Sequence, residues 1–333
     1  MDKSNKTLVI QITWWFGRNV AMTWAITELA KRRPVKVIAS RPIAFWGNPY
    51  IKSVHGLNDP KLFETVIKWN DYFELEPYTD PAFFNDAENW LNVAARQLGL
   101  DTVPEPVVFL AEHEKIMYDL WCWRDCNRPK ILFQPFWSSV NDPIGADKSY
   151  RSLYVKDAQY IANGLTQAWF EVYEVIRKWQ PVLNNCIPID SPDMRMVMWL
   201  CARYPVIWCD SCLHHCAKAF GNKAIVIRAW TDKERYWYDS NINMREFPMV
   251  AHTPMRLPMN DFDLDVSNQH TNQFSKGFLD KVIETAVKTF INNNNWLCQK
   301  SSPIELMSQT HQESETLSST KQTENSDSKK SQK

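Results

Sequence analysis

The first forty residues alternate short apolar segments with an amphipathic one, a pattern that few folds accommodate. Residues 7–13 and 35–40 are apolar runs typical of β-strands. The segment 19–31 between them places apolar residues at helical spacing, and Pro34 ends it. A strand, a helix and a second strand form a βαβ unit, whose strands are parallel and whose ligands bind at the carboxyl ends of the strands. The sequence therefore predicts an α/β fold.

The same alternation recurs in the second half, after a strand expected at 107–111, a helix at 112–121 and a linker at 124–129. Further strands are expected at 131–136, 171–176, 206–210 and 224–230, with helices near 155–166, 192–203 and 213–220. The 333 residues suit two domains of ~150 residues each. We expect domains at 1–127 and 128–276, a closing segment at 277–300 with an amphipathic helix over 277–292, and a polar disordered tail at 301–333.

Charge and hydropathy exclude several classes of function. Lys and Arg number 38 and so do Asp and Glu, so no net charge is available to hold duplex nucleic acid. No apolar run reaches the roughly 18 residues of a membrane span, and the N-terminus has no cleavage site of a signal peptide. The 8 cysteines are too sparse for a disulfide scaffold. A cytoplasmic protein without a transmembrane segment is expected.

The sharpest motif lies at residues 206–221, VIWCDSCLHHCAKAFG. A strand is expected to end at Asp210 and a helix to begin near Leu213, which leaves backbone N–H groups exposed at the strand end. Such a turn suits the phosphates of a nucleotide diphosphate, and His215 is placed to reach a phosphate oxygen or Asp210. In the alternative interpretation Asp210 and Ser211 cap the helix and His215 is structural.

This motif, D-S-x-x-x-H, resembles the donor-binding motif of the ADP-heptose heptosyltransferase family, commonly D-S/T-G-x-x-H. The segment 229–242 resembles the family's next segment, including its phage-borne relatives, at Thr231, Glu234, Tyr238 and Asn241-Ile242. The first strand with its turn and helix, Asn48-Pro49, Gln134-Pro135-Phe136 and Arg151-Ser152-Leu153 also follow the family pattern. The resemblance covers about residues 7–292.

The resemblance implies a GT-B fold, with two Rossmann-like doubly wound domains facing across a cleft. It implies an inverting transfer, without a cofactor, from a nucleotide diphosphate sugar such as ADP-heptose to a glycan or lipid-linked acceptor. That reaction belongs to lipopolysaccharide biosynthesis at the inner face of the membrane. The donor-binding residues implied are Ser138, Arg151, Asp210, Ser211, Cys212, His215 and Thr231. On the acceptor side the residues are Gly17, Glu76 and Asp80, and the catalytic candidates are Arg18, Asn19 and Asp210.

One departure from the family concerns the catalytic base. The family has an Asp in the first strand-to-helix turn, whereas this chain has Asn19, which cannot accept a proton. Another carboxylate, Asp210, Glu76 or Asp80, takes the role, or the leaving diphosphate is stabilised electrostatically by Arg18 and Arg151, or activity is lost. Two alternatives therefore stay open: a non-catalytic nucleotide-sugar or glycan-binding protein on the same fold, and a transferase acting on modified DNA bases. The neutral charge disfavours the second.

A metal site is a weaker alternative at the same motif. Cys209 and Cys212 have the spacing of zinc ligands, and His214, His215 and Cys216 are adjacent. Because no second C-x2-C pair follows, no metal is expected, and the remaining cysteines are interpreted as buried apolar residues.

The chain also has 8 Gly and 16 Trp, far fewer and far more than usual. Tryptophan stands where the family has small residues at Trp14, Trp15, Trp46, Trp137, Trp169, Trp179, Trp208, Trp230 and Trp237. Several of these positions are turns that favour glycine. We infer a gene in which UGA encodes glycine; the alternative is aromatic platforms for a sugar or base.

Overall fold

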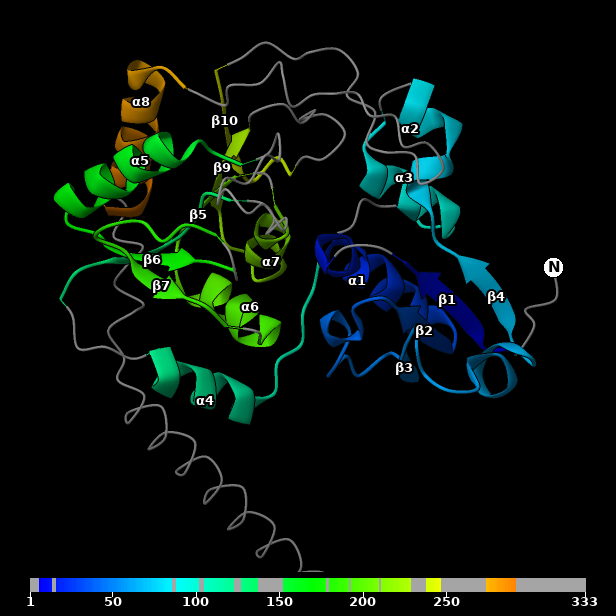
Figure 1. The fold of residues 1–333 in the computed structure, drawn as a ribbon. Helices are drawn as coiled ribbons and strands as arrows, with labels where there is room; N and C mark the ends of the chain where they lie inside the picture. Colours follow the sequence, from blue (N-terminus) through cyan, green and yellow to red (C-terminus); the bar gives the residue numbers. More distant parts are fainter. Residues whose placement is uncertain are drawn as a thin grey trace, which may run out of the picture.

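The structure is a computed structural model that describes residues 6–13, 16–85, 88–101, 105–122, 127–136, 152–177, 180–191, 193–209, 211–228, 238–246 and 274–291. It contains two α/β units, each built around a parallel β-sheet (Figure 1). The α/β fold class is confirmed.

The first unit holds a four-stranded sheet of order β3-β2-β1-β4. Its strands are β1 (Leu8–Ile12), β2 (Val35–Ala39), β3 (Ser53–Gly56) and β4 (Asp71–Glu74). Helix α1 (Phe16–Arg32) joins β1 to β2, so the expected βαβ unit is present, and the helix begins three residues before the expected position 19. From β1 the chain proceeds to β2 and β3 on one side and then returns to β4 on the other. The order of strands therefore reverses between β1 and β4.

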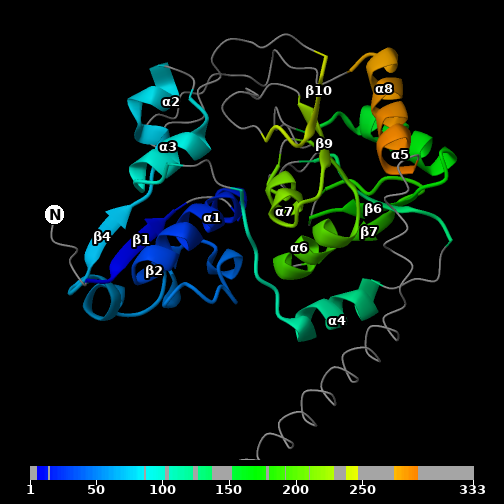
Figure 2. The same ribbon diagram turned by 180° about the vertical axis from the view of Figure 1, so that it is seen from behind.

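Short helices lie between the later strands of this sheet and after β4, and the expected strand at 107–111 is wrong. They are η1 (Pro42–Ala44), η2 (Phe63–Ile67), η3 (Pro77–Thr79), α2 (Pro81–Asn85) and α3 (Trp90–Gln97). Residues 107–111 pair with no strand, because this segment runs between the two units and the backbone N–H of Val107 donates to Thr23 Oγ1 on α1. Helix α4 (Glu112–Cys122) confirms the expected helix and packs on α6 (Met194–Arg203) of the second unit (Figure 2).

The second unit holds a six-stranded parallel sheet of order β10-β9-β8-β5-β6-β7. Its strands are β5 (Lys130–Gln134), β6 (Glu171–Val175), β7 (Ile187–Ile189), β8 (Val206–Cys209), β9 (Ala224–Arg228) and β10 (Ile242–Arg245). Its helices are α5 (Val155–Gln167), α6 (Met194–Arg203), α7 (Leu213–Ala219) and α8 (Lys276–Ala286), which η5 (Val287–Ile291) continues. The chain proceeds from β5 to β6 and β7, then crosses to β8, so here the strand order reverses between β5 and β8.

Neighbouring residues of β5 pack into two different hydrophobic cores, one on each face of the sheet. Phe133 of β5 packs with α5 and α8 on one face, whereas its neighbour Leu132 packs on the α6 and α7 face. The second of these cores is shared with the first unit, because α1 packs against α7. None of the described helices combines the length and apolarity needed to cross a bilayer.

Arg195 of α6 ties the two units together. Its guanidinium donates to the carbonyl oxygens of Ile43 at 3.0 Å and Trp46 at 3.3 Å in the first unit. It also donates to Phe109 O at 2.9 Å in the connecting segment and to both carboxylate oxygens of Glu114 on α4, at 2.5 and 2.6 Å. The side chain is almost fully buried, so a single cation joins the first unit, the connecting segment and the second sheet's helix layer.

Candidate functional site

The carboxyl ends of β5 and β8 are joined by a buried hydrogen bond. Ser211, which follows β8, donates its hydroxyl proton to Oε1 of Gln134 at the end of β5 at 2.6 Å. Since the strand order reverses between these two strands, their ends form the place where ligands of open α/β sheets bind. The expected donor residues Ser211, Cys212 and His215 lie here, after the end of β8. The hydroxyl of Ser211 is engaged with Gln134, and the side chain of Cys212 caps no backbone amide of α7.

Gly17 brings the first turn of α1 against the start of α7. A Cβ atom on residue 17 would lie 2.9 Å from both Cα and Cβ of Cys212 and 3.1 Å from Cδ2 of His215. Contact with backbone at that distance does not occur with a real Cβ, so only glycine permits this approach. The segment after the carboxyl end of β1 in the first sheet thus contacts the segment after the carboxyl end of β8 in the second.

His215 is enclosed by aromatic side chains from both units. Its Nδ1 atom lies 2.8 Å from the hydroxyl of Tyr238. The ring of Trp90, from α3, meets it edge-on at a centroid distance of 5.7 Å, and the ring of His214 lies at 3.9 Å. Only 8% of His215 is exposed, so the side chain occupies the contact between the units rather than an open surface.

Arg18 and Asn19, the two catalytic candidates on α1, are both buried. Arg18 donates to the carbonyl oxygen of Leu75 at 2.6 Å and to Oε2 of Glu76 at 3.0 Å, and its guanidinium lies 4.9 Å from the ring centroid of Tyr78. Asn19 is fully buried, and its Nδ2 donates to the hydroxyl of Ser40 at 3.2 Å. Because Glu76 follows β4, the Arg18–Glu76 ion pair spans the point where the first sheet reverses its strand order.

The carboxylates of Glu76 and Asp80, which were expected on the acceptor side, accept hydrogen bonds from nearby residues and stabilise short helices. Oε1 of Glu76 accepts from the backbone N–H of Tyr78 at 3.2 Å and so caps η3. Oδ1 of Asp80 accepts from the N–H of Ala82 at 3.0 Å and from Arg96 at 3.2 Å. Asp80 therefore holds the start of α2 and an ion pair with α3.

Four expected site residues, Ser138, Arg151, Asp210 and Thr231, lie outside the described residues. Among those described, Gly17, Cys212 and His215 are in mutual contact. Sequence reasoning did not assign a site role to Trp90, Gln134 or Tyr238. Gln134 and Tyr238 carried a signal, since both stand at positions that match the family pattern, whereas no local pattern distinguished Trp90.

Of the cysteines of the motif, Cys209 and Cys216 are buried and Cys212 is half-buried. Burial raises the pKa of the Cys212 thiol to about 12. The pKa of Cys216 is raised well above its ordinary value by burial and by its hydrogen bond with Cys201. Both therefore stay protonated at neutral pH, in a form that does not attack electrophiles.

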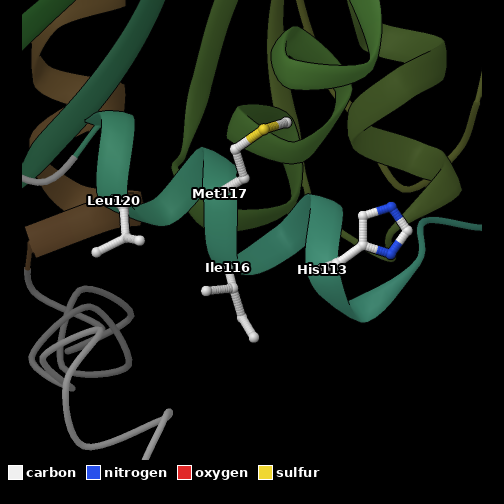
Figure 3. A pocket seen from close by; sticks show the side chains of 4 residues that line it. All are labelled: His113, Ile116, Met117 and Leu120. Atoms are coloured by element: carbon white, nitrogen blue, oxygen red, sulfur yellow. The ribbon is translucent and has the colours of Figure 1, made fainter.

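A separate pocket of about 540 Å³ lies on the outer side of α4, lined by His113, Ile116, Met117 and Leu120 (Figure 3). It contains none of the candidate site residues.

No family model matches the chain, and no curated protein matches it by sequence. Solved structures match it over most of its length. The glycosyl transferase family 9 protein from Veillonella parvula aligns with a TM-score of 0.60 at 11% identity, over 87% of this chain and 99% of that one. The E. coli ADP-heptose lps heptosyltransferase II aligns with a TM-score of 0.56 at 13% identity, over 84% and 99%.

The chain has the GT-B fold of the heptosyltransferases. A third match is the dodecameric iron-containing heptosyltransferase TibC in complex with ADP-D-beta-D-heptose, with a TM-score of 0.58 at 14% identity, over 85% of this chain and 76% of that one. The expected fold and the structural resemblance to this family are confirmed. At sequence identities this low, the likeness shows the fold and does not identify the substrate.

Proposed function

We propose that the chain is an inverting glycosyltransferase that moves a sugar from a nucleotide diphosphate sugar to a hydroxyl group of a glycan or lipid-linked acceptor. ADP-heptose is the donor that the motif resemblance favours. The observation that carries the proposal is the contact of Gly17 with Cys212 and His215. It places the carboxyl-end sites of two doubly wound sheets against each other, and a transferase needs its donor and acceptor sites adjacent.

In this proposal the second unit binds the donor. Ser138, Arg151, Asp210 and Thr231 contribute with the segment Ser211 to His215, as in the family motif. The Ser211–Gln134 hydrogen bond supports this role, because it fixes the turn that carries the motif to the end of the neighbouring strand. A phosphate-binding loop fixed in this way loses less entropy when the ligand binds.

Asp210 is proposed as the base that accepts the proton of the acceptor hydroxyl. Asn19 cannot serve, since it is an amide and fully buried. Both carboxylate oxygens of Glu76 are engaged, one by Arg18 and one by the N–H of Tyr78, and Asp80 holds Ala82 and Arg96. In the sequence, Asp210 lies between Cys209, the last residue of β8, and Ser211, which favours it over the other two. An Asp210→Asn variant should then bind nucleotide but transfer no sugar.

Titration calorimetry of the full chain with ADP, UDP and GDP tests the donor site. We expect saturable binding of at least one nucleotide, with a Kd that rises about tenfold or more in His215→Ala, because a charge-assisted hydrogen bond to phosphate is worth roughly 1.5–3 kcal/mol. His113→Ala, which removes an exposed histidine on α4, is the matched control. Absence of binding to all three nucleotides, or equal affinity in His215→Ala, would contradict the assignment.

The second candidate is a non-catalytic nucleotide-sugar-binding protein. It is favoured by Asn19, whose amide is buried and bonded to Ser40 where the family has its base. The two candidates differ in turnover. A binding protein would bind the nucleotide sugar and release no nucleoside diphosphate in the presence of acceptor, and Asp210→Asn would then behave as the unaltered chain does.

A further inference from the structure

Helix α4 packs on α6 with one of its faces. On that face Tyr118 is 4% exposed, and its hydroxyl donates to Oδ2 of Asp193 at 2.9 Å. Next to it, Nε1 of Trp199 on α6 donates to Oδ1 of Asp119 at 2.8 Å. These contacts fix which side of α4 is turned toward the second unit and leave the opposite side on the surface.

The opposite face of α4 carries side chains at helical spacing. His113, Ile116, Met117 and Leu120 occupy positions i, i+3, i+4 and i+7, and they line the pocket of about 540 Å³ (Figure 3). Met117 is 52% exposed and Leu120 is 51% exposed. Single apolar residues are common on protein surfaces, whereas a stripe at this spacing is the pattern by which helices pack against a partner helix. The face therefore suits a short amphipathic helix.

The charged groups of α4 limit what can cover this face. They are held in three ion pairs, Glu112 with Lys115, Glu114 with Arg195, and Asp119 with Arg203. Because the carboxylates of α4 outnumber its single lysine, the helix lacks the cationic rim with which amphipathic helices bind anionic bilayers. Two turns of one helix also offer far less than the roughly 800 Å² that each partner buries in a stable interface between proteins. A tethered segment of the same chain meets neither limit.

The sequence after η5 contains a segment of the required kind. Residues 292–333, which include the tail expected to be disordered, lie outside the described residues. Beyond position 301 the apolar residues are Ile304, Leu306, Met307 and Leu317. The first three directly follow Ser302-Pro303, and Glu305 stands three positions after the serine. Ser-x-x-Glu with proline at the first helical position is a signature of a helix start, so the sequence predicts a short helix over 302–311.

This segment can reach α4. In Figures 1 and 2, the later end of α8, which η5 continues to Ile291, is the end nearer to α4. Residues 292–303, which precede Ile304, span up to about 40 Å when extended, and a small domain is only about 30 Å across. A short tether keeps its segment at an effective concentration in the millimolar range, so even a small apolar contact is occupied.

We propose that residues 302–311 form a helix on the outer face of α4 and bury Ile304 and Met307 against Met117 and Leu120. The contact lies within one molecule and is independent of the proposed glycosyltransferase activity. It removes the apolar stripe of α4 from water, which is the interaction that stabilises it.

Oxidation of Met117 by hydrogen peroxide in the full chain, followed by peptide mass spectrometry, tests the cover on α4. We expect Met117 to be oxidised about fivefold faster or more in the double variant Ile304→Ser, Met307→Ser, because these changes remove most of the apolar area of the contact. Leu317→Ser is the matched control, since it removes an apolar tail residue outside the segment. Equal rates in the unaltered chain and the double variant, or an equal rise in Leu317→Ser, would overturn the proposal.

The oxidation rates are compared at about 1 and 100 µM protein, because a contact within one molecule does not depend on concentration. Protection of Met117 that appears only at the higher concentration would overturn the proposal in favour of a second copy of the chain.

Hydrogen exchange of residues 302–311 tests the contact from the side of the tail. We expect their amides to be protected in the unaltered chain and to exchange faster in Leu120→Ser, because that change removes an apolar contact from the face of α4. Leu57→Ser is the control, since Leu57 is an exposed leucine after β3 in the first unit. Exchange at the rate of an unstructured peptide in the unaltered chain, or the same acceleration in Leu57→Ser, would overturn the proposal.

Discussion

A Cβ atom on Gly17 would lie 2.9 Å from the Cα atom of Cys212, so α1 and α7 meet at a distance that only glycine allows. Gly17→Ala should push the two helices apart and cost about 1–3 kcal/mol of unfolding free energy, the usual cost of overpacking. Urea denaturation checks the stability, and ADP titration checks the site. Gly277→Ala is the control, since a Cβ there meets only the Ser275 hydroxyl at 4.0 Å. Equal stability and affinity in the two variants would contradict the close contact.

The buried Arg195–Glu114 pair should stabilise the arrangement of the two units. The hydrogen bond from Arg195 lowers the pKa of the Glu114 carboxyl. Arg195→Met leaves that carboxylate and three carbonyl oxygens without their donor, so we expect a loss of about 3–5 kcal/mol in urea denaturation. Arg96→Met is the control, because Arg96 is half exposed and its ion pairs should be worth about 1 kcal/mol or less. If Arg195→Met lost no more stability than Arg96→Met, the contacts of Arg195 would contribute little to the free energy of unfolding.

Glu174 should make stability depend on pH. It is fully buried in β6, and burial raises the pKa of its carboxyl to about 7. Between pH 4.5 and about 7 the folded state therefore holds a proton that the unfolded chain has released, so stability falls as pH rises through this window. The total fall is at most about 3.4 kcal/mol, at 1.36 kcal/mol for each of about 2.5 pKa units.

Glu174→Gln keeps an oxygen for the N–H of Leu183 and removes the titration. The variant should lose that part of the pH dependence and be the more stable form at pH 8. The measurement is the free energy of unfolding in urea at several pH values, with the exposed Glu64→Gln as control. A pH profile of Glu174→Gln that matches the unaltered chain would refute this assignment.

The central strands could be predicted from the sequence and three edge strands could not. β1, β2, β5, β8 and β9 are largely apolar runs because they are mostly buried on both faces, and β6 (EVYEV) carries two glutamates among its apolar residues. The strands β3 (SVHG), β7 (IPI) and β10 (INMR) lie at sheet edges, where partial exposure permits His, Pro, Asn and Arg, so no apolar run marks them.

The candidate site was predictable only in its local part. The turn at 210–215 is contiguous in sequence, and a strand followed by a helix places it. This turn also contacts segments far from it in the chain: Cys212 contacts Gly17, and His215 contacts Tyr238. Such pairings depend on how the two sheets pack, which neither hydrophobic periodicity nor motif spacing encodes.

Trp169 supports the inference that some tryptophan positions suit glycine. Its φ angle is +76°, a left-handed conformation that costs an L-residue roughly 1–2 kcal/mol. Trp208 lies fully buried in β8, a strand rather than a turn, and its indole N–H has no acceptor among the described residues. Trp46 is half exposed, with a negative φ.

Trp169→Gly should therefore be about 1 kcal/mol more stable than Trp169→Ala, because both lose the ring contact with Arg128 but only glycine relieves the backbone strain. Thermal unfolding of the two variants measures the difference. Codons at positions 169 and 208 provide an independent check: UGA supports glycine as the intended residue, and UGG contradicts it.

Sugar transfer by the full chain is the direct test of the proposed glycosyltransferase activity. The full chain is incubated with ADP-heptose and a panel of heptose-accepting glycan precursors, while ADP release and the anomeric proton of the product are followed by NMR. We expect acceptor-dependent ADP release and a product of inverted anomeric configuration, both abolished in Asp210→Asn. ADP release that is absent with every acceptor, or a product of retained configuration, would contradict it.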